Sequence, residues 1–353
     1  MKKFLLLLLS LFFTVFLVAC ESIYFYGQAI NGQLSIISNR ENIQTLVNDP
    51  AVDVELKQSL ESIISIRNFA KNSLALPVEK NYSTYVDLQR PFVVWNVFAA
   101  AEFSVTPKDW CYPIAGCVSY RGYFSEDAAR KYADSLVDEG FDVYVGGIAA
   151  YSTLGWFADP VLNTIINREE HRLAALLFHE LAHQLVYVPG DTQFNESFAT
   201  TIEMEGLKRW LEENNNSATV STLVEQAARE QQYRQEFVSL VQSSIPVLED
   251  LYSSALPLLE KRQEKAQVIQ KLRDDYQVLK QQWQGYSAYD GWFAGDINNA
   301  RLNTVATYFN HVPAFETLLA QSNYLLPDFY NRVQALAKLS SEERQQVLTR
   351  LTP

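Results

Sequence analysis

The stretch from Leu176 to Gln184, LLFHELAHQ, constrains the fold most strongly, because it places two histidines one helical turn apart in an apolar segment. On an α-helix, His179 and His183 lie about 40° apart on one face, so both imidazoles can reach one metal ion. Glu180 projects about 100° away from His179, where it can reach a water without binding the metal. This spacing predicts a buried helix carrying two ligands of a hydrolytic zinc site, with Glu180 as general base. The alternative is two histidines satisfied by local hydrogen bonds.

A third protein ligand is expected shortly after this helix. Pro189 and Gly190 end the helix, and Asp191 or Thr192 can cap a second one. Glu196 lies 13 residues after His183, in the first turns of that second helix. We predict that its carboxylate completes the metal site. The alternative is a solvated glutamate that only favours the helix dipole.

Two other polar residues of the second helix are assigned to the surroundings of the metal. Glu203 is seven residues after Glu196 and falls on the same face. It is either a hydrogen-bond acceptor for a ligand histidine or an exposed glutamate. Asn195, next to Glu196, is predicted to support the metal ligands or to contact substrate.

With these residues in place, the chain resembles a known family. The stretch from Ala150 to Trp210, which contains AYSTLGWFADP and FHELAHQLVYVPGDTQFNESFATTIEMEGLKRW, resembles the predicted-aminopeptidase family of bacterial lipoproteins, a relative of the glutamate-zincins. The sequence WCYPIAGCVSYRGYF at 110–124 is similar to the same family's upstream motif, and a weaker match continues from Asn298 to Phe315. The resemblance implies a zinc peptidase, with aminopeptidase action as the family label.

The resemblance also implies roles for two tyrosines. Segment 150–157, which includes Tyr151, would be an edge strand that binds the substrate backbone in extended form, or else a packed hairpin. Tyr308 falls where the family motif places a tyrosine, so it is the first candidate to stabilise the oxyanion. His311 is the second candidate. Either side chain has simple packing as its alternative.

The N-terminus has the pattern of an export signal. Lys2 and Lys3 precede a short apolar run that ends in Leu17-Val18-Ala19-Cys20, which resembles a bacterial lipobox. We predict a lipoprotein signal peptide at 1–19, a lipid on Cys20 and a location in the bacterial envelope, facing the periplasm. An uncleaved membrane anchor is the alternative, although the apolar run is short for one. The choice between inner and outer membrane stays open.

The charge of the chain limits its partners. The formal net charge is −12, and it becomes −14 when a leader containing Lys2 and Lys3 is removed. Such acidity argues against nucleic acid and against electrostatic docking on anionic lipid. The expected partners are therefore a peptide substrate and the membrane, the latter through the lipid on Cys20. No oligomeric state is predicted.

Two cysteines and an arginine stand out in the upstream motif. Cys111 and Cys117 are the thiols that remain beside Cys20, and in an exported chain such a pair predicts a disulfide. Arg121 could bind a substrate carboxylate or the developing oxyanion. Pairing with a local acid is the alternative.

The expected fold is α+β and mostly helical, with a zincin-like active-site helix beside a small sheet. Residues 20–353 are predicted to form one metallopeptidase domain. Its parts are an N-terminal α/β portion at about 28–160, active-site helices at about 161–213, and a helical portion at about 217–353. A helical stretch is expected from Asp159 into the His179 helix, and the long charged helices are expected to break near Pro246 and Pro257.

The sequence leaves three functions open: an aminopeptidase, an endopeptidase and a lipoprotein without catalytic activity. An aminopeptidase needs an acid that holds the free α-amine, and Glu203, Asp191 and Asp159 are the candidates. An endopeptidase acting on envelope proteins needs none. A lipoprotein that binds or assembles other proteins without cleaving them is the third possibility. The complete zinc-ligand and base motif favours catalysis.

Overall fold

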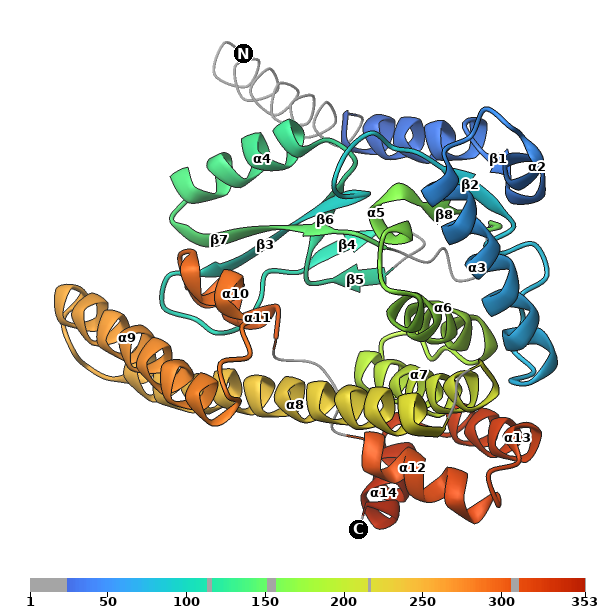
Figure 1. Cartoon of the computed structure of the whole chain (residues 1–353). Helices are drawn as coiled ribbons and strands as arrows, with labels where there is room; N and C mark the ends of the chain where they lie inside the picture. The colour runs from blue at the N-terminus through green and yellow to red at the C-terminus, as the bar shows by residue number, and fades with distance from the viewer. Residues whose placement is uncertain (1–23, 113–115, 151–156, 215–216, 306–310, 353) are drawn as a thin grey trace, which may run out of the picture.

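The computed structural model describes residues 24–112, 116–150, 157–214, 217–305 and 311–352. The fold is α+β and mostly helical, with small sheets of two or three strands, which confirms the predicted class. Figure 1 shows the sheets at one end of the molecule and most of the helices at the other. Among the helices of these ranges, none is long and apolar enough to span a bilayer.

The first small sheet joins distant parts of the chain. Strand β2 (Thr84–Val86) pairs antiparallel with β1 (Glu41–Asn42) and parallel with β8 (Val161–Leu162). A helix at 24–38, α2 (Ile43–Asn48) and α3 (Val54–Asn72) belong to the same end of the chain. The predicted helical stretch from Asp159 is therefore wrong at its start. Pairing with β2 extends the chain at β8 before the short α5 (Asn163–Ile166).

The second sheet has the order β6-β3-β7, with β3 (Val94–Ala101) antiparallel to both neighbours. Helix α4 (Glu126–Asp138) connects β6 (Arg121–Tyr123) to β7 (Phe141–Ile148) and packs on the sheet. Ser125 caps the start of this helix, because its side chain accepts a hydrogen bond from the Ala128 amide. Strand β7 runs through Gly146 and Gly147. A Cβ at Gly147 would lie 2.3 Å from the Phe92 ring, so this glycine permits close packing beside β3.

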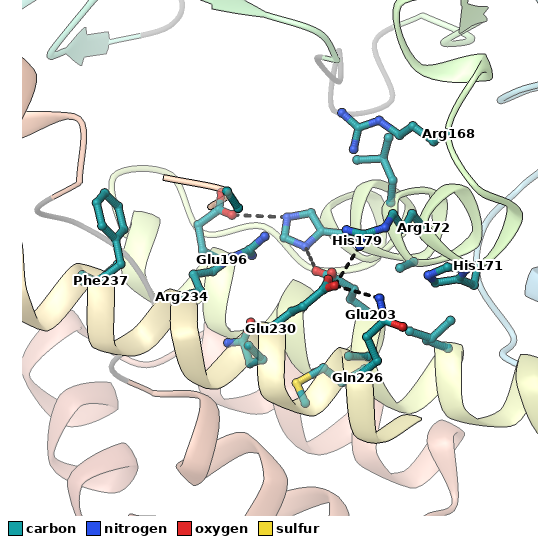
Figure 2. Close-up of a pocket in the computed structure, with 18 of the residues that line it drawn as sticks. Arg168, His171, Arg172, His179, Glu196, Glu203, Gln226, Glu230, Arg234 and Phe237 are labelled. Atoms are coloured by element: carbon teal, nitrogen blue, oxygen red, sulfur yellow. Dashed lines mark hydrogen bonds and ion pairs between the residues drawn. The ribbon is translucent and has the colours of Figure 1, made fainter. Parts of the chain in front are cut away.

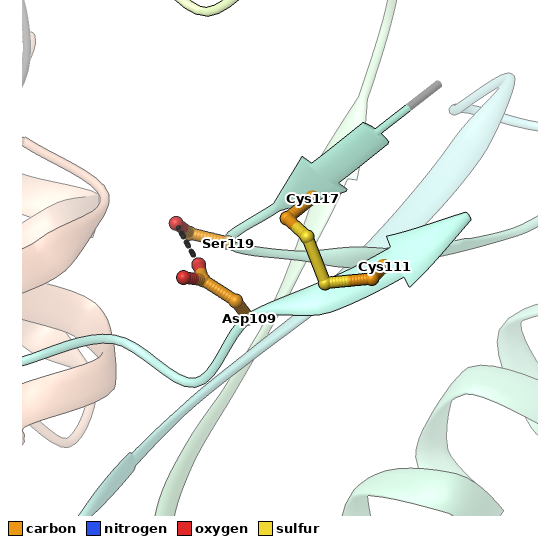
Figure 3. The surroundings of a disulfide bond; sticks show 4 residues. All are labelled: Asp109, Cys111, Cys117 and Ser119. Atoms are coloured by element: carbon orange, nitrogen blue, oxygen red, sulfur yellow. Dashed lines mark hydrogen bonds between the residues drawn. A yellow bond between two sulfur atoms is a disulfide. The ribbon is translucent and has the colours of Figure 1, made fainter. Parts of the chain in front are cut away.

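A disulfide closes the third sheet. Strands β4 (Trp110–Tyr112) and β5 (Gly116–Val118) pair antiparallel, and Cys111 is bonded to Cys117 across them (Figure 3). Beside it, the Ser119 hydroxyl donates to Asp109 Oδ1 at 2.8 Å. The predicted disulfide is confirmed.

The central helix pair consists of α6 (Glu170–Leu185) and α7 (Thr192–Asn214). The largest hydrophobic cluster runs through both helices, from Ile43 near the N-terminus to Leu348 near the C-terminus. Helices α12 (Val312–Gln321), α13 (Leu326–Ala337) and α14 (Ser341–Leu351) contribute to it. The pair is therefore held by the core of the molecule.

A long helical arm runs along the central pair. Helix α8 (Ser217–Ser253) is followed by α9 (Leu258–Gln282), which folds back along it (Figure 1). The break near Pro257 is present, but Pro246 lies inside α8, so the break predicted there is wrong. The arm has a second cluster of its own, which includes residues of the short α10 (Asp290–Ala294) and α11 (Asn299–Asn303).

Candidate metal centre and catalytic cleft

Helix α6 carries the two motif histidines on one face, and its other faces are buried. Leu177, Phe178, Leu181 and Ala182 have no exposed surface. The His179 and His183 side chains keep 14% and 9% of theirs. Because the apolar faces are fixed in the core, the imidazoles have little freedom to move away from each other.

A tight turn then brings α7 back against α6. Gly190 has φ +81°, a left-handed conformation that favours glycine, and the Asp191 carboxylate accepts a hydrogen bond from the Phe194 amide at 3.0 Å. The buried Asn195 side chain bonds both the amide and the carbonyl of Val188, at 2.8 and 2.9 Å. Asn195 thus holds the turn that positions its neighbour Glu196.

The close packing of the two helices depends on a small residue. A Cβ at Gly206 of α7 would lie 2.8 Å from the Phe178 ring. Any larger residue would push α7 away from α6. This contact sets the separation at which α7 presents its acids to the histidines.

Three side chains converge at this interface. The Nε2 atoms of His179 and His183 are 3.2 Å apart, and the Glu196 carboxylate lies 3.2 Å from the first and 3.5 Å from the second. One ligand atom from each of the three residues lies within 4.8 Å of the others. Within the described ranges, this is the group of histidine, cysteine and acidic residues that can hold a metal ion.

Glu203 orients the first histidine from the opposite side of its ring. Its Oε2 lies 3.0 Å from His179 Nδ1, and Figure 2 marks this contact with a dashed line. A proton on Nδ1 satisfies this contact and leaves the lone pair of Nε2 directed at His183 and Glu196. The structure therefore places Glu203 where a hydrogen-bond acceptor for a metal-bound histidine belongs.

The electrostatics of the group match a cation-binding site. Burial lowers the pKa of His179, but hydrogen bonds with Glu196 and Glu203 outweigh burial and raise it to about 10. Burial, together with the charge of His179, lowers the pKa of His183 to about 4. Burial raises the pKa of Glu196, but the histidines and Arg234 outweigh it and lower the pKa below its usual value. A positive charge is thus strongly favoured between the two carboxylates.

The donor atoms also fit a metal ion by type. Two imidazole nitrogens 3.2 Å apart cannot both present lone pairs to each other without a cation or a proton between them. Two neutral nitrogens and one carboxylate form a set that zinc accepts in catalytic sites. His179, His183 and Glu196 are therefore the residues that would hold such an ion.

Glu180 lies next to this group in a partly buried position. Burial raises the pKa of Glu180, the charge of His179 opposes this rise, and the charges of Glu196 and Asp159 add to it. A raised pKa brings a carboxylate closer to the range in which it can accept and return a proton near neutral pH. The environment of Glu180 suits a general base.

Tyr82 is a neighbour of Glu180 that the sequence did not point to. Both residues line a small cavity beside α6. Tyr82 is buried, has φ +53°, and its amide donates to the Asp159 carbonyl at 2.7 Å. Burial raises the pKa of Tyr82, and the charges of Glu180 and Asp159 raise it further, so the phenol stays protonated. A strained backbone at such a position is typical of functional sites.

A cleft of about 640 Å³ opens in front of these residues. Helices α6 and α7 form one wall, with His179, Glu180 and Glu196 exposed to the cleft. Helix α8 forms the other wall, and in Figure 2 its residues Glu230 and Arg234 lie across from His179. The volume is in the range of sites that bind small ligands and peptide segments.

Other residues predicted for the site lie elsewhere. The Arg121 guanidinium packs over the rings of Phe25 and Tyr132, at 4.2 and 4.4 Å. In the described part of the chain, it is not among the residues that line the cleft. The His311 amide donates to Ser197 Oγ at 3.2 Å, and the buried His311 also falls outside that lining. Neither position favours a role at the metal.

The three acids considered for binding an α-amine all have other contacts. Glu203 faces His179. Asp191 caps α7 and pairs with Arg344 at 2.6 Å. Asp159 is buried, and its backbone amide donates to Asn81 Oδ1 at 3.0 Å. The carboxylates of Glu203 and Asp191 are therefore occupied, and within the described residues Asp159 does not line the cleft.

Three other predicted residues, Tyr151, Tyr308 and Cys20, lie outside the described residues. Edge-strand binding by 150–157 and oxyanion stabilisation by Tyr308 therefore stay predictions.

The structure adds cleft residues that were not predicted. Arg172 precedes His179 by seven residues on α6, so helical spacing puts it near the same face and could have revealed it. Arg168 lies before α6 and has no such spacing. Arg234 of the other wall carries no such signal, because only the packing of α8 against α7 brings it to the cleft.

Comparison with known proteins gives one result. No curated protein and no solved structure matches the chain. A family model described as "Putative aminopeptidase" matches residues 24–348, a range that includes the metal-binding group and both walls of the cleft. The chain belongs to this "Putative aminopeptidase" family.

Proposed function

We propose that the protein is a zinc-dependent peptidase of the bacterial envelope and that it acts as an aminopeptidase. The observation that carries the proposal is the convergence of His179, His183 and Glu196 on one group that could hold a metal ion. Of these residues, His179 and Glu196 line the cleft together with Glu180. Peptidase action agrees with the family of the chain, and exo-action rests on the family description.

Each residue of the group would have a separate role in catalysis. His179, His183 and Glu196 would hold zinc, which when bound would act as a Lewis acid on water and on the scissile carbonyl. Glu203 would keep His179 in the required tautomer. Glu180 would accept a proton from the attacking water and return it to the amine that leaves when the C–N bond breaks.

The experiment uses matched peptides with free and with acetylated N-termini. The protein is assayed with zinc and with a chelator, and mass spectrometry identifies the products. Stepwise loss of N-terminal residues from the free peptides only, abolished by the chelator, is the expected result. Internal cuts in both sets would instead establish an endopeptidase. No cleavage of either set would contradict the proposed activity and favour a binding or assembly factor.

The envelope location is tested separately. The lipobox-like sequence before Cys20 supports attachment through an acyl chain. In a bacterial host, the wild-type protein should fractionate with membranes and Cys20→Ser should not. Equal membrane association of the two would remove the lipid anchor from the proposal.

A further inference from the structure

The cleft contains an unusual concentration of arginine. Arg168 and Arg172 lie at the α6 side and Arg234 on α8, and all three line the space that His179 and Glu180 face (Figure 2). His171 lines the same cleft and lies near Arg172 in Figure 2. The same lining also holds four glutamates, Glu180, Glu196, Glu203 and Glu230, so whether each arginine already has an acidic partner decides what it can bind.

Three of the four glutamates that line the cleft are already committed to other partners, and the fourth is Glu180, the candidate general base. Glu196 and Glu203 face the histidines. Glu230 accepts hydrogen bonds from Arg172 at 2.7 Å and from Gln226 at 3.0 Å. Glu169 contacts Arg172 at 3.2 Å and His171 at 3.6 Å. Arg172 is thus neutralised by two glutamates.

Arg168 differs from its neighbour in this respect. It lies in the connection between α5 and α6, and within the part of the chain that the structure describes, no hydrogen bond or ion pair reaches its guanidinium. Partial burial and the nearby charge of Arg172 lower its pKa. An unpaired guanidinium beside a second one is stabilised when an anion binds between them or next to them.

We propose that Arg168, next to Arg172, binds a carboxylate of the peptide substrate, from an aspartate or glutamate side chain or from the peptide's C-terminus. This inference rests on the proposed peptidase function. A guanidinium forms two parallel hydrogen bonds with a carboxylate, so it selects carboxylates over amides of the same shape. Arg168 is then a residue for substrate specificity, and the zinc ligands and Glu180 are not changed by its removal.

Four peptides of one sequence test the proposal. They combine glutamate or glutamine at one position with a free or amidated C-terminus, and the position is moved along the peptide in successive sets. For the wild-type protein, the KM for the peptide with the recognised carboxylate should be about 10- to 100-fold lower than the KM for the matched peptide with an amide in its place. In Arg168→Gln, the KM for the carboxylate peptide should rise to that of the neutral peptide, so the preference is lost. The kcat for the neutral, amidated peptide should not change.

Two further variants make the result specific. Arg168→Lys keeps the charge without the paired donors, and it should retain only part of the preference. Arg130→Gln is the matched control, because Arg130 is an exposed residue of α4 that pairs with Glu126. It should behave as wild type. The peptide position at which the preference appears tells side-chain recognition apart from C-terminal recognition.

Binding without turnover separates this inference from the proposed function. Fluorescence anisotropy of the same labelled peptides with zinc-loaded Glu180→Gln protein measures the contact alone. If wild type cleaves the neutral peptide but neither assay shows a preference, or if Arg168→Gln keeps it, the carboxylate contact is overturned. If the peptides bind with the preference and none is cleaved, the contact stands and the peptidase function fails.

Discussion

The two walls of the cleft differ in what holds them. The α6–α7 wall is part of the main core, and residues such as Phe178 and Leu181 have no exposed surface. The α8 wall rests largely on the separate cluster of the arm, in which Phe237 stacks on Tyr289 at a centroid distance of 4.1 Å. The first wall carries the three residues that could hold a metal ion, and the second carries cleft residues such as Glu230 and Arg234.

We infer from this difference that one wall serves metal binding and the other serves substrate binding. Metal ligands must keep their positions within a fraction of an ångström, and a large core provides that rigidity. Substrate contacts tolerate more movement and can change without loss of the metal. Changes in the first wall should therefore affect metal and stability together, and changes in the second should affect substrate alone.

The largest effect is expected from Glu196→Ala. Removal of the carboxylate leaves two histidines to hold the ion, so metal content and peptide hydrolysis should both fall to background. Elemental mass spectrometry and the peptide assay measure the two quantities. Glu205→Ala is the control, because Glu205 pairs with Arg209 at 2.7 Å on the same helix. Full metal occupancy in Glu196→Ala would remove Glu196 from the ligand set.

Phe178→Ala tests the rigidity of the first wall. Phe178 is fully buried and packs against Gly206 of α7, so the cavity should lower the free energy of unfolding by about 3–5 kcal/mol. Urea denaturation measures the loss. We also expect weaker metal binding, because α7 loses its close contact with α6. Unchanged metal affinity in a clearly destabilised variant would argue against coupling between core and site.

Glu203→Gln should have an intermediate effect. The neutral amide can still approach His179 Nδ1, but it no longer provides a charged acceptor, so metal affinity should fall by about 10- to 100-fold. Competition with a chromogenic chelator gives the affinity. The free energy of unfolding of the metal-free protein serves as the control for a general folding defect. Wild-type affinity would mean that Glu203 does not act on the metal through His179.

The smallest effect on the metal is expected from Phe237→Ala in the second wall. This change removes the ring that stacks on Tyr289, so KM for peptides should rise and metal content should stay at the wild-type value. The peptide assay measures KM, and elemental mass spectrometry measures the metal content. A loss of metal comparable to that in Phe178→Ala would show that the walls are not independent.

Local signals in the sequence were enough to predict the first wall. The spacing of His179 and His183, the turn at Pro189-Gly190 and the cap at Asp191 each depend on residues a few positions apart. The predicted metal donors meet in the structure for the same reason, because one short turn brings Glu196 back to the histidines.

Features that depend on distant parts of the chain could not be predicted. Strand β8 forms because Val161 pairs with Tyr85, and nothing near Asp159 signals that partner. Helix α8 continues through Pro246, where packing of Val241 and Leu248 in the arm cluster outweighs the lost backbone hydrogen bond. Arg234 reaches the cleft only because α8 packs against α7 in the folded protein.

The most direct test of the account is to measure metal content and turnover together in wild type and Glu180→Gln. Glu180 lies beside the metal donors but is not one of them. The variant should therefore keep one zinc ion per chain, bound as in wild type, and lose about 10²- to 10⁴-fold in kcat. Wild-type turnover in a fully loaded Glu180→Gln protein would contradict the assignment of the general base, and with it the proposed mechanism.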